Sequence, residues 1–426
     1  MWFGLYVLIR PVDRKEFEGR TFPHTYDVLV YQEGGHVYAK DRNGNVICVD
    51  SPTACIQEAV DSLSDGGLIK LGKGTFRIQS PISINKNGTY IEGEGPGVTT
   101  LLNIGNKDNL ISITGSGNTW LRESGLSRLT IHGNRDYYSV NNCVYLNQFW
   151  IARLDDVEVL GCSGTGVRAD GNPWASFLLS ERLNIHDNSG RGLVLQGELN
   201  VVSINTLLLR YNGDEPLYIG SIPGTNHDPW EVHIKTLLTE YNGNVSVIGG
   251  SSALVKIDYW WGDTDHGIYI PATGGTIIID KLFYGSKSSY PLNADSGATI
   301  FGDYWLLGFA AGVTPGVALR IVNSKLYLRR LDTFNSTGIM VGGSYELKIQ
   351  EGQYATRKSG TATIAANTTS VTVNHGLIVA PSKVLVTPLG QPPGPIWVSD
   401  VTATSFKINI STAPSVDLPV SWYAEI

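Results

Sequence analysis

The densest group of acidic and aromatic side chains in the sequence lies between residues 240 and 266. It comprises Glu240 and the segment Trp260-Trp-Gly-Asp-Thr-Asp-His266. Hydrolysis of a glycosidic bond uses two carboxyl groups that flank the bond, one as general acid and the other as base or nucleophile. Asp263, Asp265 and Glu240 are therefore the candidate catalytic residues, and His266 can tune one of them. Because Asp is also a common turn residue, a purely local structural role is the alternative for each aspartate.

A row of aromatic side chains is expected beside these carboxyl groups. If each repeat of the chain is one coil, the positions just after successive strands form an outward-facing column of Tyr211, Tyr241 and Trp261. The C–H face of a sugar ring packs on aromatic rings, so this column suits a carbohydrate. The alternative is that the rings lie under loops or between subunits, since exposed apolar rows are usually covered. The candidate substrate-binding residues are Tyr211, Tyr241, Trp260, Trp261, Arg210 and His266.

The elements that must position these residues are short strands that recur every 20 to 30 residues. Each strand core has the pattern apolar-x-apolar, which is the alternation expected of a strand with one buried face. A β repeat of this length predicts a solenoid in which each repeat is one coil. The strand cores are Leu129/Ile131, Val157/Val159, Leu183/Ile185, Leu207/Leu209, Leu237/Thr239, Ile257/Tyr259 and Leu282/Tyr284.

An amide or small residue follows most of these strand cores. Stacked coils lie about 4.8 Å apart, so Asn side chains in one column can bond to one another and to the turn backbone. A Gly then precedes a second strand in most repeats. This order of strand, Asn turn, Gly and strand predicts a right-handed parallel β-helix. The expected column is Asn134, Cys162, Asn188, Asn212, Asn242 and Gly262.

Three further segments bear on the family. They are Thr53-Ala-Cys-Ile-Gln-Glu-Ala-Val60, Gly66-Gly-Leu-Ile-Lys-Leu-Gly-Lys-Gly-Thr-Phe-Arg-Ile78 and Ile91-Glu-Gly-Glu-Gly95. With them, residues 53–350 resemble the pectate-lyase-like β-helix superfamily, which includes polygalacturonases, pectate lyases, other polysaccharide-cleaving enzymes and viral tailspikes. The resemblance implies the fold, and it implies a polysaccharide as substrate or ligand.

The catalytic motifs of those enzymes are incomplete in this chain. Asp155-Asp156 stands alone, His266-Gly267 lacks the leading Gly of the polygalacturonase motif, and no Arg-Ile-Lys segment occurs. A pectate lyase needs clustered acids for Ca²⁺ and an Arg or Lys base, and no group of residues is singled out for these roles. We transfer no catalytic residue from either family, and the sequence predicts no metal and no cofactor.

Composition excludes several other classes of protein. The net charge is −7 and no basic run occurs, which argues against a nucleic acid partner. No stretch approaches about 18 consecutive apolar residues, so no membrane span is predicted. The apolar segment 2–9 is interpreted as an N-terminal strand, with a remnant signal sequence as the alternative.

The sequence contains four cysteines. Cys48 and Cys55 bracket a Pro turn and can form a disulfide in an oxidising compartment, with a reduced pair as the alternative. Cys143 and Cys162 are expected as small buried residues of the coils. No pair of cysteines has the spacing of zinc ligands.

The chain divides into five segments by pattern and composition. Ser51 and Pro52 suit the start of a helix that would cover the open end of the solenoid. The last segment resembles small terminal modules of phage tail proteins, which implies trimerisation or ligand binding, and a spacer fits it as well. The segments are an N-terminal β-rich piece (1–50), a capping helix (51–67), the β-helix (68–350), a linker (351–360) and a β-sandwich (361–426).

The predicted fold is therefore all-β: a right-handed parallel β-helix solenoid with an N-terminal capping helix and a small C-terminal β-sandwich. The predicted function is that of a polysaccharide-processing enzyme, a glycoside hydrolase with paired carboxylates in a groove on the β-helix. The expected location is extracellular or on a virion surface. The alternatives are a polysaccharide lyase, a glycan-binding tailspike or adhesin without activity, and a homotrimeric shaft in which the aromatic column is buried between subunits.

Overall fold

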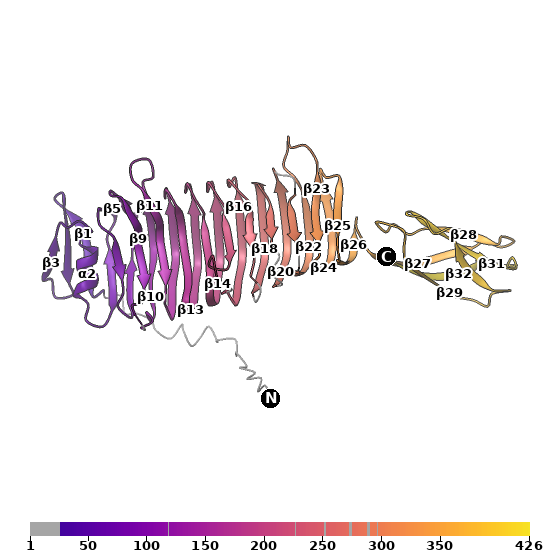
Figure 1. The fold of residues 1–426 in the computed structure, drawn as a ribbon, viewed down its shortest axis with the longest axis horizontal. Helices are drawn as coiled ribbons and strands as arrows, with labels where there is room; N and C mark the ends of the chain where they lie inside the picture. Colours follow the sequence, from indigo (N-terminus) through magenta and orange to yellow (C-terminus); the bar gives the residue numbers. More distant parts are fainter. Residues whose placement is uncertain are drawn as a thin grey trace, which may run out of the picture.

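A computed structural model describes residues 26–117, 119–225, 227–250, 253–271, 275–287, 290–295 and 297–426. The strand expected over residues 2–9 lies outside the described residues. The described part is a long solenoid followed by a separate small module (Figure 1). Nearly all of its regular structure is β, and the helix α2 (Ile56–Ser62) lies at the N-terminal end of the solenoid.

The solenoid is a parallel β-helix, as the repeat pattern predicts. Strands of one coil pair in parallel with strands of the next, about one repeat further along the chain. Its strands are β4 (Gly67–Leu71), β5 (Gly74–Ile78), β6 (Ile82–Ile84), β7 (Thr89–Glu92), β8 (Thr99–Asn103), β9 (Lys107–Thr114), β10 (Ser124–His132), β11 (Val140–Asn147), β12 (Ile151–Leu160), β13 (Thr165–His186), β14 (Leu193–Arg210), β15 (Leu217–Gly220), β16 (Glu231–Glu240), β17 (Ser246–Ile248), β18 (Leu254–Asp265), β19 (Ile268–Ile270), β20 (Thr276–Ser286), β21 (Leu292–Asp295), β22 (Thr299–Phe309), β23 (Val317–Val322), β24 (Lys325–Phe334), β25 (Gly338–Gly342) and β26 (Glu346–Gly352).

Each coil has three sides, which we call sheets A, B and C. The long strands bend at a corner. The first half of each belongs to sheet A and the second half belongs to sheet B. Sheet C contains the shorter strands β15, β17, β19, β21, β23 and β25. Sheet A includes residues 151–154, 177–180, 201–204, 231–234, 254–257, 276–279, 299–302, 325–328 and 346–349. Sheet B includes residues 157–160, 183–186, 207–210, 237–240, 260–263, 282–285, 305–308 and 331–334.

The expected alignment of coils holds as far as β16 and is wrong at β18. Leu237 of β16 lies opposite Trp260 of β18, not opposite Ile257. Ile257 belongs to sheet A, where it lies opposite Ile234. The apolar alternation of β18 continues across the corner, so the pattern alone did not show where sheet A ends. The sheet B part of β18 therefore begins three residues later than predicted.

The predicted column of stacked amides forms inside the turn after sheet B. The Asn188 side chain donates to Asn212 at 2.9 Å, Asn212 donates to Asn242 at 3.0 Å, and Asn242 donates to Asp265 at 3.1 Å. These four side chains are almost completely buried. The last position of this Asn ladder is therefore Asp265, and the expected position Gly262 is wrong because of the shift at β18.

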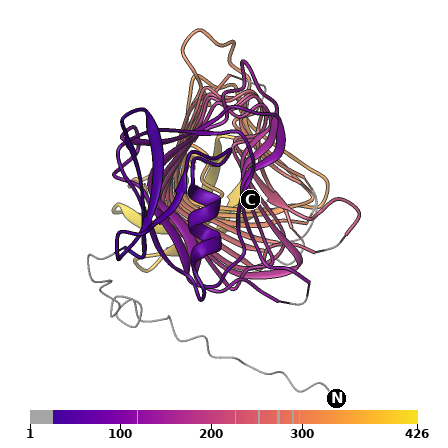
Figure 2. The same cartoon turned by 90° about the vertical axis from the view of Figure 1, so that its left-hand side faces the viewer.

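The N-terminal end is closed by a meander and the helix. The strands β1 (Val28–Glu33), β2 (His36–Asp41) and β3 (Val46–Val49) are antiparallel to one another, and β1 pairs in parallel with β4. The N-terminal piece is thus continuous with the solenoid. Figure 2 shows α2 across the open end, where Ile56, Ala59 and Val60 are buried. The end is therefore covered, as predicted.

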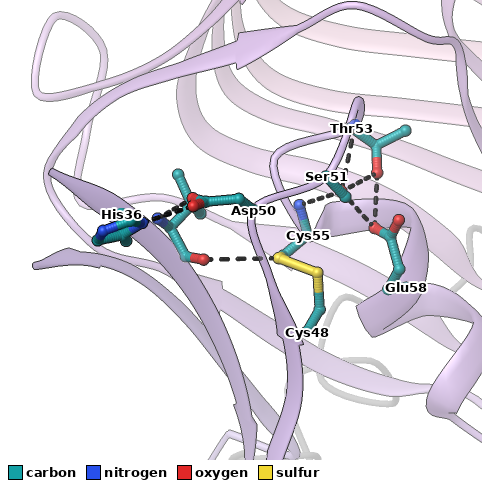
Figure 3. Close-up of a disulfide and its surroundings, with 8 residues drawn as sticks. His36, Cys48, Asp50, Ser51, Thr53, Cys55 and Glu58 are labelled. Atoms are coloured by element: carbon teal, nitrogen blue, oxygen red, sulfur yellow. Dashed lines mark hydrogen bonds and ion pairs between the residues drawn. A yellow bond between two sulfur atoms is a disulfide. The ribbon is translucent and has the colours of Figure 1, made fainter.

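The helix begins later than the sequence suggested. Ser51 does not cap it directly; its hydroxyl accepts a hydrogen bond from the Cys55 amide at 2.8 Å. The same hydroxyl and that of Thr53 donate to Glu58 at 2.9 and 2.6 Å. These bonds stabilise a tight turn before α2, beside the disulfide between Cys48 and Cys55 (Figure 3).

A second disulfide joins Cys143 of β11 to Cys162 in the turn after β12. Sequence analysis treated these two residues only as small buried side chains. They lie on different sides of neighbouring coils, with Cα atoms 6.0 Å apart, and the folded coil brings them together. All four cysteines are therefore paired.

The C-terminal module is a small β-sandwich, as predicted. Two three-stranded antiparallel sheets pack on a core that includes Phe406 and Trp422. No helix among the described residues is long and apolar enough to cross a membrane. The strands of the module are β27 (Arg357–Ile364), β28 (Ser370–Asn374), β29 (Lys383–Pro388), β30 (Ile396–Ser399), β31 (Ser405–Ile410) and β32 (Leu418–Glu425).

Candidate functional site

The outer face of sheet B carries two columns of outward side chains. They follow from the register of β12, β13, β14, β16, β18, β20 and β22, because alternate residues of a strand point to the same face. The first column is Glu158, Asn184, Leu208, Leu238, Trp261, Phe283 and Leu306. The second column is Leu160, His186, Arg210, Glu240, Asp263, Gly285 and Gly308.

Three charged residues predicted for the site are neighbours in the second column. Arg210 lies opposite Glu240, and Glu240 lies opposite Asp263. Asp263 is exposed and Glu240 is half-buried. Within the described residues, neither carboxyl group has a hydrogen-bond or ion-pair partner. The Arg210 Nε atom is buried, and it likewise has no partner in the described part of the chain. The two carboxyl groups are therefore available to a ligand, whereas the Arg210 Nε atom is closed off from solvent.

The third candidate carboxyl group, Asp265, is not on this face. It is 0% exposed at the end of the Asn ladder. Its Oδ1 atom accepts hydrogen bonds from the backbone and side-chain nitrogens of Asn242, at 2.8 and 3.1 Å. Burial raises the pKa of Asp265. The prediction that Asp265 contacts substrate is wrong, because the shifted register turns this residue into the coil.

Trp260 is also misplaced in the prediction. It is 0% exposed, and its indole nitrogen donates to the Thr239 hydroxyl at 3.1 Å. Trp260 packs edge-on against Tyr284 inside the coil. A residue buried in this way fills the core and does not contact a sugar at the surface. The three-residue shift at β18 exchanges the faces expected for Trp260 and its neighbours.

The predicted column of three aromatic rings is in fact a pair. Tyr211 and Tyr241 are exposed and stack with centroids 5.2 Å apart and planes 3° from parallel. Trp261 belongs to another column, opposite Leu238. Because the two Tyr rings cover each other's inner faces, a ligand meets their edges and outer faces only.

A larger aromatic surface lies further along sheet B. Trp261 is 44% exposed and stacks on Phe283 at 6.4 Å. Phe283 also contacts Tyr259 at 5.8 Å and Tyr304 at 5.5 Å. We call these four residues the aromatic platform. Sequence analysis included only Trp261 among them, although Phe283 alternates with Leu282 and Tyr284 and could have been recognised as outward-facing.

A small recess separates Asp263 from Phe334, at the edge of the aromatic platform. Its floor is Gly285, where a Cβ atom would lie 3.3 Å from Asp263 Oδ1 and 3.7 Å from the Phe334 ring. The next glycine, Gly308, is covered by the Phe334 ring, since an added Cβ would meet that ring at 2.7 Å. Gly285 therefore leaves room for about one methyl group beside Asp263, and Gly308 leaves none.

The opposite end of sheet B holds a second acid–base cluster that the prediction missed. The His186 ring lies between two carboxylates, with Nδ1 2.6 Å from Asp187 and Nε2 3.2 Å from Glu158. Glu158 also accepts from Thr130 at 2.8 Å and from Asn184 at 3.3 Å. The Glu158 carboxylate raises the pKa of His186, and the His186 ring lowers the pKa of Glu158. Each charged group in this cluster is hydrogen-bonded to another member, so the role of the cluster is structural.

His266 follows Asp265 and is half-buried. Burial is the largest cause that lowers its pKa, and Lys287 adds to the effect. No group of three or more His, Cys, Asp or Glu residues in the described part of the chain is arranged to hold a metal ion.

No family model matches the sequence, and no curated protein matches it. Among solved structures, the tailspike gp61 of Pseudomonas phage phi297 has a TM-score of 0.53 and 8% identity, over 88% of this chain and 92% of that chain. The A-module of the mannuronan C-5 epimerase AlgE4 of Azotobacter vinelandii has a TM-score of 0.48 and 17% identity, over 70% of this chain and 93% of that chain. At such identities the tailspike likeness shows the fold, a parallel β-helix, and nothing finer.

Proposed function

We propose that this chain binds a polysaccharide along the outer face of sheet B and hydrolyses it with Glu240 and Asp263. The observation that carries the proposal is the adjacency of these two unpaired carboxyl groups to the aromatic platform. Exposed aromatic residues beside open carboxylates combine a surface for sugar C–H groups with groups able to transfer protons. Trp261 is the exposed ring of the platform, and the half-buried rings of Tyr259, Phe283 and Tyr304 support it.

The spacing of the pair suggests which hydrolytic route is used. Glu240 and Asp263 lie opposite each other on adjacent strands, and adjacent strands are about 4.8 Å apart. This strand spacing is close to the roughly 5 to 5.5 Å that separates the two carboxyl groups of a retaining enzyme, and we propose the retaining route on that basis. One carboxyl group would protonate the leaving oxygen while the other attacks the anomeric carbon.

A polysaccharide lyase is the second candidate, favoured by Arg210. Arg210 lies next to Glu240 in the second column, and its guanidinium group carries a permanent positive charge. In a lyase, such a cation would neutralise the carboxylate of an acidic sugar before the adjacent proton is removed. A glycan-binding protein without activity would use the same aromatic platform.

The proposed location is extracellular or on a virion surface. The likeness to the phi297 tailspike in fold is compatible with a virion protein. Both disulfides support an oxidising environment, since such bonds are rare in the cytosol. A homotrimer held by the C-terminal module remains a proposal, and the mass in solution of the chain without residues 361–426 tests it. An unchanged oligomer size would exclude the module as the cause of assembly.

The test of function is release of reducing ends from a panel of plant, algal and microbial polysaccharides. Ultraviolet absorbance is recorded in parallel, because lyase products are unsaturated and absorb whereas hydrolase products do not. Wild type is compared with Asp263→Asn, Glu240→Gln and the control Glu33→Gln, an exposed acid in β1 at the far end of the solenoid.

Each result of this assay has a definite meaning. Release without absorbance, lost in the two site variants and kept in the control, supports the hydrolase. Release with absorbance supports the lyase. If both site variants still release reducing ends, the assigned site is refuted. If no polysaccharide of the panel is cleaved, a glycan-binding protein without activity is favoured.

A further inference from the structure

A groove on the outer face of sheet A is separate from the columns of sheet B. It lies at the C-terminal end of the solenoid, where β20, β22, β24 and β26 meet the first strand of the β-sandwich. Its volume is about 390 Å³, within the range of roughly 300 to 1,000 Å³ usual for ligand sites. We call it the sheet A groove. It is lined by Asp280, Phe301, Asp303, Tyr327, Arg329, Lys348, Gln350 and Arg357, with backbone from Gly302 and Leu328.

The floor of the groove is aromatic. Phe301 and Tyr327 lie opposite each other on adjacent coils, and their rings stack with centroids 5.1 Å apart and planes 17° from parallel. Phe301 is 39% exposed. Lys348 is the next residue of this column, and its Nζ atom lies 5.5 Å from the centre of the Tyr327 ring. The column thus consists of two aromatic rings followed by a cationic side chain.

The walls of the groove are charged side chains that hold one another in place. Arg329 bonds to Asp303 at 2.5 Å and to Glu351 at 3.2 Å. Glu346 accepts from the Tyr327 hydroxyl at 2.7 Å and pairs with Lys348 at 2.6 Å. These pairs fix both donors and acceptors before a ligand arrives, which reduces the entropy lost on binding. Asp303 is paired with Arg329, so it is not free to act as an acid.

The end of the groove is closed from outside the solenoid. Arg357 is the first residue of β27, which belongs to the C-terminal module. The cations Arg329, Lys348 and Arg357 line the groove together with the acids Asp280 and Asp303. Glu346 and Glu351, which bond to Lys348 and Arg329, balance these cations, so the surroundings of the groove carry no excess of positive charge.

We propose that the sheet A groove is a second, non-catalytic carbohydrate-binding site. The outer face of Phe301 and the edges of the stacked Tyr327 ring contact the C–H groups of a sugar, and the paired charges bond to its hydroxyl groups. The inference rests on the proposed function only in taking the ligand to be a polysaccharide. Such a site would hold the polymer at the C-terminal end while sheet B acts on another part of it.

The test is affinity electrophoresis of the full chain in gels that contain alginate, polygalacturonate, dextran or laminarin. The background variant is Asp263→Asn, which prevents degradation of the polymer. Retardation of this protein in at least one of the four gels is expected. The double variant Phe301→Ala/Tyr327→Ala should weaken the apparent affinity by about tenfold, the value for loss of an aromatic contact of about 1.4 kcal/mol. Tyr327→Phe, which keeps the ring, is the matched control and should bind like the background.

A second readout separates this groove from the proposed active site. On short oligosaccharides, the Phe301→Ala/Tyr327→Ala protein with Asp263 intact should release reducing ends at the rate of wild type. The proposal is overturned if the double variant is retarded as strongly as the background protein, or if no gel retards the background protein. It is also overturned if the double variant loses rate on short oligosaccharides. A change of mass in solution would also overturn it, since the rings would then belong to a subunit contact. Circular dichroism checks that the variants are folded.

The proposed active site and the proposed binding groove can fail independently of each other. Retardation that depends on Phe301 and Tyr327, without release of reducing ends from any polymer, supports the groove and refutes catalysis on sheet B. Release that depends on Asp263, without an effect of the double variant on retardation, refutes the groove alone.

Discussion

Asp263 and Asp265 lie two positions apart in β18, one on the outer face of sheet B and the other in the Asn ladder inside the turn. Asp263 is exposed and has no partner within the described residues, whereas Asp265 is fully buried and bonded twice to Asn242. Thr264 between them has a φ of 57° and turns the chain into the coil, so the same residue type holds the fold after the turn and remains open to a ligand before it. The difference shows that unsatisfied bonding capacity, rather than acidity, marks a candidate site.

The outer face of sheet B repeats this contrast along its length. At the N-terminal end, Glu158, His186 and Asp187 satisfy one another, as the interior ladder does. Towards the C-terminal end, Glu240 and Asp263 stand open beside the aromatic platform. Side chains whose bonds are satisfied should therefore govern stability, and the open ones should govern binding and turnover.

The largest effect expected from this contrast is on turnover by Asp263→Asn. Loss of a general acid or base should reduce kcat by about 10² to 10⁴-fold. Stability should change by less than about 0.5 kcal/mol, because the side chain is exposed and makes no bond in the described structure. Reducing-end assays and denaturant titrations measure the two quantities. Glu158→Gln should lower stability and leave kcat nearly unchanged. Equal losses of kcat in both variants would contradict this distinction.

The next effect is on stability at the other aspartate. Asp265→Ala removes the acceptor for two nitrogens of Asn242 and should lower the free energy of unfolding by about 1 to 3 kcal/mol. Asp265→Asn keeps the Oδ1 acceptor and should be tolerated. Burial raises the folded-state pKa of Asp265 above its ordinary value of 3.8. Wild type therefore loses stability as the pH rises from 3.8 through the folded pKa, and the Asn variant avoids that loss.

Denaturant titrations of wild type and Asp265→Asn at acid and neutral pH measure this difference. The stability of the Asn variant relative to wild type should increase with pH. A relative stability that falls as the pH rises would show that the carboxylate, and not its oxygen acceptor, supports the ladder.

A smaller effect is expected from the aromatic platform. Trp261→Ala should lower kcat/KM by about tenfold, because an exposed aromatic contact is worth roughly 1.4 kcal/mol. Tyr211→Ala should have less effect, since Tyr241 covers one face of that ring. The comparison uses kcat/KM on one polysaccharide for both variants. A larger loss at Tyr211 would move the bound glycan from the aromatic platform to the Tyr pair.

The smallest effect is the pH dependence of the Glu158 and His186 pair. The folded pKa of His186 is raised above 6.5, so its contribution is present below 6.5 and is lost as the pH rises through the folded value. The folded pKa of Glu158 is lowered below 4.5, so its contribution is present above 4.5 and is lost as the pH falls through the folded value. The pair should stabilise the fold most between 4.5 and 6.5.

Glu158→Gln tests this window by denaturant titration across the pH range. The loss of stability should be below about 1 kcal/mol, because the pair is partly exposed. It should be largest inside the window and smaller at alkaline pH. A loss that does not vary with pH would show that the bonds from Thr130 and Asn184 matter and the ion pair does not.

Much of the candidate site was predictable where the repeat is regular. Arg210, Glu240, Tyr211 and Tyr241 lie in the columns expected for them, because β14 and β16 carry clear apolar alternation. The prediction failed at β18, where the alternating pattern runs from Ile257 across the corner without a break. A shift in register then moved Trp260 and Asp265 inside. The cluster at His186 was missed because its members come from three separated segments.

The sequence by itself determined the coil, the Asn ladder and the covered N-terminal end. These follow from local periodicity and residue type, which act within one repeat. Only the tertiary structure decided the register of β18, the pairing of Cys143 with Cys162 and the assembly of the sheet A groove from residues 280 to 357. Each of these depends on which residues of neighbouring coils face one another. That is set by the lengths of the connections between strands and by packing inside the coil, which a single repeat does not encode.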